Sequence, residues 1–113
     1  MKYMMLVCVT EGIELSPEER AQIGPATEAW VQEMDGRGIR LEGEQLRSAS
    51  DATTVQMRGG ELLISDGPFA ETKEQIGGFY LVDCKDLDEA IDVASNIPGA
   101  RDGSIEVRPI WEM

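Results

Sequence analysis

The hydrophobic and polar positions of the chain predict a strand and then a helix at its start. Residues 3–9 are almost continuously apolar, which is typical of a central strand buried on both faces. A helix is predicted from Ser16, because a serine cap, a proline at the first helical position and a glutamate at the third satisfy the first backbone amides. Gly36 and Gly38 end this helix. Its apolar positions form one stripe made of Ile23, Thr27, Trp30, Val31 and Met34.

The pair Gly24-Pro25 interrupts the helical pattern. A proline inside a helix removes one hydrogen bond and collides with the preceding turn, at a cost of about 3 kcal/mol. We therefore expect either a kink or two abutting helices, the second starting at Pro25.

The middle of the chain predicts an edge strand followed by a hairpin. We interpret residues 39–41 and 45–47 as one strand, bulged or bent where residues 42–44 break it. Residues 53–57 and 61–65 alternate and are rich in strand formers. They flank a Gly-Gly pair, which is typical of a tight hairpin turn.

The last third of the chain repeats the strand-helix-strand order. Residues 79–82 predict another central strand, and Asp86 with Glu89 forms the capping box of a second helix. Residues 104–110 alternate with the period of a strand, and Pro109 confines that end to an edge or terminus.

Two strand-helix-strand units predict one α+β domain over residues 1–113, with a ferredoxin-like antiparallel sheet and both helices on one face. The other face would be bare, although the strands at 3–9 and 79–82 carry apolar residues toward both sides. A second copy of the chain is the simplest cover for that face. We therefore expect a symmetric homodimer.

Composition excludes several functions. The 113 residues contain 10 Lys plus Arg against 22 Asp plus Glu, so the net charge of −12 disfavours nucleic-acid and membrane partners. There is no histidine, the commonest general base and metal ligand. We predict no metal and no cofactor. The apolar start is too short to span a bilayer, and Cys8 and Cys84 are interpreted as reduced and buried, so we expect a cytoplasmic protein.

The run DGPFAETKE at residues 66–74 is the most unusual segment of the chain. Together with QIGGFY at residues 75–80 and IEVRP at residues 105–109, it resembles the DGPF branch of the YCII-related family of small bacterial proteins. The resemblance implies a ferredoxin-like subunit that pairs into a dimeric α+β barrel, a bacterial origin and a link to an extracytoplasmic-function sigma factor. Other members are proposed enzymes with a His-Asp pair, whereas this chain has Asp66 but no histidine.

The side chains of this run and of the last strand suggest a site. Asp66 is either a turn former or a carboxylate that Gly67-Pro68 aims into a pocket, where Arg108 pairs with it. Glu106 and Arg108 share one face of the last strand, so they form either an interface ion pair or a grip on an anionic ligand. Asp66 and Arg108 are the candidate catalytic pair. The candidate ligand-binding residues are Asp66, Pro68, Phe69, Glu74, Tyr80, Glu106 and Arg108.

Three functional hypotheses follow. The first is a dimeric, non-enzymatic module that binds a small ligand or serves as a regulatory accessory of a sigma-factor system, where the acidic charge suits basic partners. The second is a cofactor-free lyase or isomerase in which Asp66 moves a proton and Arg108 holds an anionic substrate. The third is a structural role, in which the acidic run closes the dimer.

Overall fold

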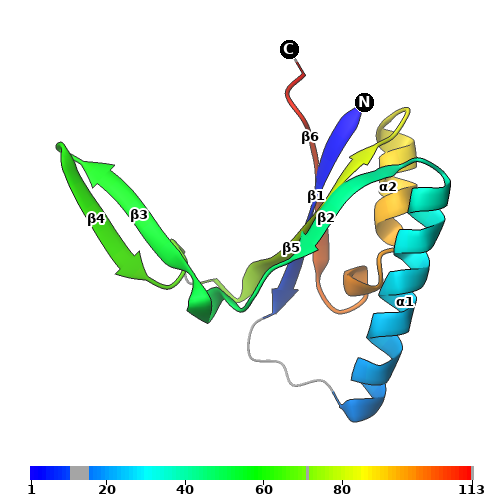
Figure 1. Cartoon of the computed structure of the whole chain (residues 1–113), viewed down its shortest axis with the longest axis horizontal. Coiled ribbons are helices and arrows are strands. Elements are labelled where there is room, and N and C mark those ends of the chain that lie inside the picture. Colours follow the sequence, from blue (N-terminus) through cyan, green and yellow to red (C-terminus); the bar gives the residue numbers. More distant parts are fainter. Residues whose placement is uncertain (11–15, 71, 113) are drawn as a thin grey trace.

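A computed structural model of the chain describes residues 1–10, 16–70 and 72–112, so Glu71 of the acidic run lies outside the described residues. A strand-helix-strand unit stands at each end of the chain, and a hairpin stands between them (Figure 1). The elements in order are β1 (Lys2–Thr10), α1 (Pro17–Gly36), β2 (Arg40–Gln45), the short helix η1 (Ala49–Asp51), β3 (Thr53–Arg58), β4 (Glu61–Asp66), β5 (Glu74–Asp83), α2 (Leu87–Ser95), the short helix η2 (Pro98–Ala100) and β6 (Ser104–Pro109).

The main sheet is antiparallel, with four strands in the order β2-β5-β1-β6, and β3 pairs with β4 in a separate two-stranded sheet. Helices α1 and α2 both lie against the same face of the main sheet (Figure 1). This is the ferredoxin-like arrangement with a hairpin inserted in its middle. The predicted α+β class, the central position of β1 and the edge position of β6 are confirmed.

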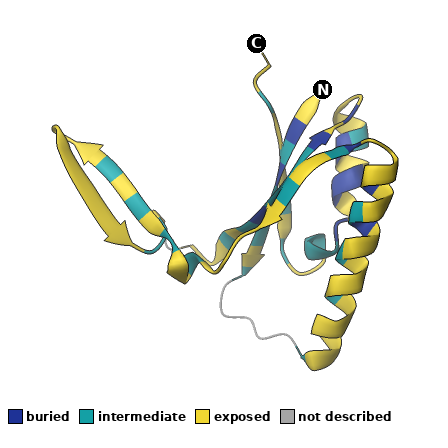
Figure 2. Ribbon diagram, viewed as in Figure 1, coloured by how far each residue is buried: buried dark blue, intermediate teal, exposed yellow. Residues whose placement is uncertain are grey.

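The core lies between the two helices and the main sheet (Figure 2). Trp30 of α1 contacts both the second helix and the sheet. Its indole Nε1 donates to the Val93 carbonyl of α2 at 3.1 Å, and its ring centroid lies 4.6 Å from that of Tyr80 on β5. The buried hydrophobic residues are Tyr3, Met5, Trp30, Met34, Ile39, Val82, Cys84, Ala90, Val93, Ala94 and Ile97.

Helix α1 runs without interruption through Pro25. The expectation of two abutting helices is therefore wrong. Pro25 is exposed, so its ring lies on the solvent side, while Trp30 and Met34 are buried on the side that faces the sheet. Packing of that apolar stripe holds the helix together across the one hydrogen bond that the proline removes.

Replacing Pro25 with alanine is expected to raise the free energy of unfolding by about 1–2 kcal/mol, because alanine restores the missing amide and removes the ring clash, partly offset by a more flexible unfolded chain. Urea unfolding followed by circular dichroism measures the change. Pro17 stands at the first helical position, where a proline removes no hydrogen bond, so Pro17→Ala is the control and should be close to neutral. A loss of stability in Pro25→Ala would contradict a continuous helix.

Strand β2 is a bulged edge strand, as predicted, with its register shift between Arg40 and Glu42. The predicted break at residues 42–44 is wrong, because these residues pair with β5. A Cβ atom on Gly43 would collide with the ring of Tyr80. Glycine at this position therefore lets the Tyr80 ring lie close to β2.

The predicted hairpin is confirmed as β3–β4, and it projects away from the main sheet (Figure 1). Its turn is made by Gly59 and Gly60, whose φ angles of 58° and 82° favour glycine. The projection shows in the radius of gyration of 16.0 Å, whereas a compact chain of this length has about 13 Å. We call this hairpin, residues 53–66, the arm.

Candidate functional site

The face of the main sheet that points away from the helices is apolar at its centre. Tyr3, Met5 and Val82 belong to the core on the helix side, so the residues that alternate with them point to the other side. No helix among the described residues covers that side (Figure 1). We call it the open face. Its central residues are Met4, Leu6 and Cys8 on β1 and Phe79 and Leu81 on β5, with Glu42 and Glu44 on one edge strand and Glu106 and Arg108 on the other.

Three of the predicted site residues, Glu74, Glu106 and Arg108, lie at the rim of the open face. Arg108 forms an ion pair with Glu106 at 2.5 Å, in which both side chains are at least half exposed. The hydroxyl of Ser104 donates to the carboxylate of Glu74 at 3.3 Å. An exposed ion pair of this kind contributes at most about 1 kcal/mol to stability.

Cys8 lies on the open face close to these carboxylates. Partial burial raises the pKa of its thiol, and the negative charges of Glu106 and Glu74 raise it further. Because only the thiolate is a strong nucleophile, Cys8 is a weak one at neutral pH. Both Cys8 and Cys84 are free thiols, and Cys84 is buried as predicted, but Cys8 is only partly buried because it lies on the uncovered face of the sheet.

Asp66 is the last residue of β4 and is exposed at the base of the arm, opposite Thr53. Backbone groups close the turn that follows it: the Gly67 amide donates to the Ala52 carbonyl at 2.7 Å, and the Thr54 hydroxyl donates to the Gly67 carbonyl at 2.8 Å. Gly67 has a φ of 92°, a conformation that requires glycine. The geometry therefore supports the first alternative for Asp66, in which the segment DGP at residues 66–68 forms a turn.

The structure does not bring Asp66 and Arg108 together. They belong to two different sheets, and the described residues contain no ion pair between them. Pro68 is half-buried, whereas Phe69 is 78% exposed. The connection to β5 is held instead by Gln75, whose side-chain amide donates to the Ala70 carbonyl at 2.8 Å.

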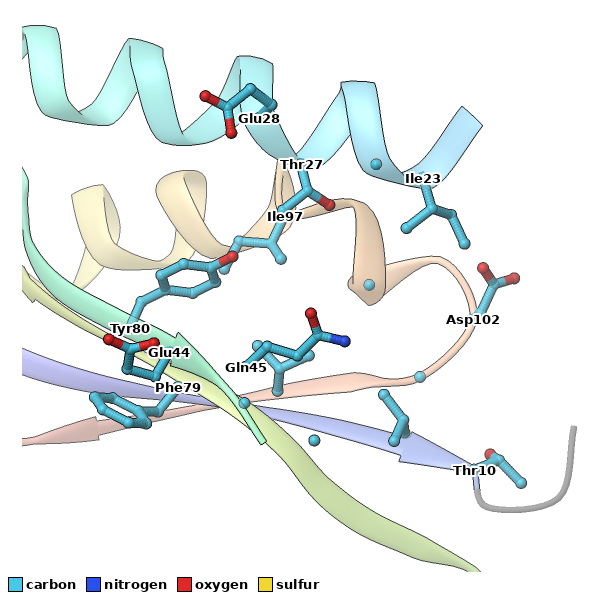
Figure 3. Close-up of a pocket in the computed structure, with 17 residues that line it drawn as sticks. Thr10, Ile23, Thr27, Glu28, Glu44, Gln45, Phe79, Tyr80, Ile97 and Asp102 are labelled. Atoms are coloured by element: carbon cyan, nitrogen blue, oxygen red, sulfur yellow. The ribbon is translucent and has the colours of Figure 1, made fainter. Parts of the chain in front are cut away.

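A cleft of about 740 Å³ opens on the other side of the sheet, beneath the first half of α1 (Figure 3). It lies between α1, the ends of β1 and β2, the middle of β5, and the connection from α2 to β6. Five of its lining residues are glycines, which carry no side chain that fills the space: Gly24, Gly77, Gly78, Gly99 and Gly103. Its apolar walls include Val7, Val9, Ile23 and Ile97.

The charged residues that line the cleft are all acidic: Glu28 and Asp102, together with the end of β2 at Glu44, whose position opposite Phe79 puts its side chain on the open face. Tyr80 reaches into the space between β5 and the helices (Figure 3). Burial raises the pKa of its phenol, and the nearby Arg40 only partly offsets that rise, so the hydroxyl stays protonated and able to donate. The arrangement suits a neutral or cationic ligand with an apolar body.

Sequence reasoning missed this cleft, although it named Tyr80 as a ligand-binding residue. The available signal was the apolar stripe of α1, which begins at Ile23 and Thr27, well before the bulky Trp30. Four of the five cleft glycines, at positions 77, 78, 99 and 103, are far from this stripe in the sequence, so the pattern alone did not reveal the empty space.

No group of three or more His, Cys, Asp or Glu side chains within 1–10, 16–70 and 72–112 is placed to hold a metal ion. In the same ranges, neither helix has both the length and the hydropathy needed to cross a bilayer.

Comparison with known proteins places this fold in a family. The family model of the YCII-related domain matches residues 1–113. The chain is also 43% identical to an uncharacterized protein of Rhizobium meliloti (strain 1021), in an alignment that covers 74% of this chain and 82% of that protein. The full-length match, together with a ferredoxin-like fold of the expected kind, shows that the chain belongs to the YCII-related family.

Proposed function

We propose that this protein is a homodimeric ligand-binding module, and that the cleft beneath α1 takes a small molecule with an apolar body and a neutral or cationic polar group. The observation that carries the proposal is the size and lining of that cleft. Pockets for small ligands commonly measure about 300–1,000 Å³ and combine apolar walls with a few polar groups.

The charge of the cleft argues against an anionic ligand there. Its charged lining residues are carboxylates, whereas Arg108, the cation expected to grip an anion, is on the opposite face of the sheet and pairs with Glu106. A carboxylate or phosphate ligand would meet like charge in the cleft, which is unfavourable in a partly desolvated site. An anion bound by Arg108 would need a second site on the open face.

Homodimer formation is part of the proposal because the open face has the composition of an interface, with an apolar centre and a charged rim. The total exposed surface supports it as well. The chain exposes 8060 Å², whereas a folded monomer of its 12.4 kDa exposes about 6,100 Å². Two copies that bury their open faces against each other would form the dimeric α+β barrel that the resemblance implies.

Membership of the DGPF branch and a regulatory role beside a sigma factor rest on the resemblance of residues 66–74, and the net charge of −12 suits a basic partner. The free thiols Cys8 and Cys84 support a reducing, cytoplasmic location. The catalytic hypothesis ranks below ligand binding, because Asp66 is exposed in the single chain and a strong carboxylate base needs shielding from water.

Filling the cleft tests the proposal. A library of neutral, cationic and anionic small molecules is screened by thermal shift, and each ligand found is titrated by calorimetry. Thr27 is half-buried on the cleft side of α1, so Thr27→Phe is expected to weaken binding at least about tenfold by occupying the space.

Ala26 is the adjacent, exposed residue of the same helix, so Ala26→Phe is the matched control and should leave affinity unchanged. Both variants are checked for native circular dichroism. The cleft is excluded as the binding site if Thr27→Phe binds as tightly as the wild type, and the proposed ligand class is excluded if only anions bind.

A further inference from the structure

The arm carries an apolar side that is largely exposed to solvent. In the β3–β4 register, Val55 lies opposite Ile64 and Met57 lies opposite Leu62, and directly opposed residues share one side of a hairpin. These four side chains are 57–62% exposed. The other side of the arm is mostly polar, with Thr54 opposite Ser65 and Gln56 opposite Leu63.

An amphipathic hairpin of this kind needs a surface to pack against. A two-stranded hairpin alone is marginally stable in water, because it buries little apolar area for the backbone it orders. A cluster of exposed apolar side chains on a protein of this size marks an interaction surface. The elements that the arm would need for support, α1 and α2, lie on the far side of the main sheet (Figure 1).

We propose that the apolar side of the arm docks on a second copy of this chain, so that the two arms of the homodimer clasp the two protomers reciprocally. The inference rests on the homodimer of the proposed function. It goes further by assigning a contact outside the open face.

The exposed area fits this occupant. The surface of 8060 Å² exceeds that of a typical monomer of this mass by about 1,900 Å². Each subunit of an obligate homodimer buries about 1,000–2,500 Å². The excess is similar in size to the area that one protomer of an obligate homodimer buries.

The position of the arm also fits a second copy. The arm leaves the main sheet on the side away from α1 and α2, which is the side of the open face (Figure 1). A copy seated on the open face would therefore lie beside the arm. Twofold symmetry would then place the arm of that copy against the first protomer.

Charge favours the arm as a contact between identical copies. Each chain carries a net charge of −12, so two copies repel wherever their carboxylates meet. Residues 54–57 and 62–65 of the arm contain no charged side chain. The arm thus offers an uncharged apolar surface through which two acidic chains can touch.

The test compares two double variants that change one cross-strand pair each. Val55→Thr with Ile64→Thr keeps strand-forming residues and removes apolar surface from the docking side. The control, Gln56→Thr with Leu63→Thr, changes the opposed pair on the other side of the same arm. Sedimentation equilibrium is expected to show a dimer dissociation constant raised at least about a hundredfold for the first variant, because the two arms lose four contacts together, and nearly unchanged for the control.

Three results would overturn the clasp. If the first variant dimerises like the wild type while a charge on the open face abolishes dimerisation, the clasp is wrong and the homodimer stands. If both double variants weaken the dimer equally, the assignment of the Val55–Ile64 side of the arm as the docking side is wrong. If the wild type is a monomer at micromolar concentration, the clasp and the homodimer are both wrong.

Hydrogen exchange on the wild type tests the clasp without any substitution. Amides of β3 and β4 are expected to exchange at least about tenfold more slowly above the dimer dissociation constant than below it, since the arm is supported only in the dimer. Slow exchange in the dilute monomer would show that the arm packs on its own chain. Fast exchange at both concentrations would show that the second copy does not cover it.

Discussion

Replacing Leu6 with aspartate is expected to turn the proposed homodimer into a monomer. Leu6 is at the centre of the open face, opposite Phe79 on one neighbouring strand and Glu106 on the other. In a face-to-face dimer the change buries one unpaired carboxylate per protomer, each costing several kcal/mol, so the dissociation constant should rise at least about a thousandfold. Analytical ultracentrifugation over a concentration series measures it.

The matched control is Ile91→Asp, which makes a similar change at a residue of α2 that is 52% exposed. Since α2 lies on the other face of the sheet, this variant should dimerise like the wild type (Figure 1). A Leu6→Asp protein that still dimerises with wild-type affinity would show that the second copy does not sit on the open face. Native circular dichroism of both variants ensures that the comparison concerns association and not folding.

The largest loss of stability is expected from Trp30→Ala. Trp30 is 5% exposed, and it contacts both the second helix, through its bond to Val93, and the sheet, through Tyr80. Removing a buried aromatic side chain of this size costs about 3–5 kcal/mol, because the cavity left behind relaxes only in part. Urea unfolding at a fixed protein concentration measures the change, since the stability of a homodimer depends on concentration.

Trp30→Phe separates the packing from the hydrogen bond. The Val93 carbonyl also accepts the Asn96 amide, so losing the indole donor leaves it with one partner. We therefore expect Trp30→Phe to cost about 1 kcal/mol, plus a small term for the lost ring area. Equal losses for Trp30→Ala and Trp30→Phe would contradict the central packing role of the ring.

Local signals predicted the elements well because each depends on neighbouring residues only. Ser16 caps α1 by accepting the Glu19 amide at 3.2 Å, and Asp86 caps α2 by accepting the Glu89 amide at 2.9 Å. The Gly-Gly pair makes the hairpin turn in the conformation that it predicted. Side chain and backbone meet within three residues in each case, so the sequence alone contains the whole interaction.

The prediction failed where a local rule competed with distant packing. Pro25 disfavours a helix locally, yet the buried stripe of α1 against the sheet outweighs that cost and keeps the helix whole. For Asp66 two alternatives were open, a turn or a pairing with Arg108, and the inserted hairpin puts Asp66 at the base of the arm and Arg108 on the edge of another sheet. Their proposed catalytic roles stay predictions, as do the ligand roles of Pro68 and Phe69.

The sequence by itself determined the order of the elements, the ferredoxin-like class and the apolar character of both faces of the central strands, since periodicity and capping are short-range properties. Only the tertiary structure decided that the arm stands away from the body and that a cleft lies beneath α1. The glycines of the cleft come from residues 24, 77–78, 99 and 103, which no short-range pattern connects. Space left empty between distant segments is a property of packing, and it exists only once the chain has folded.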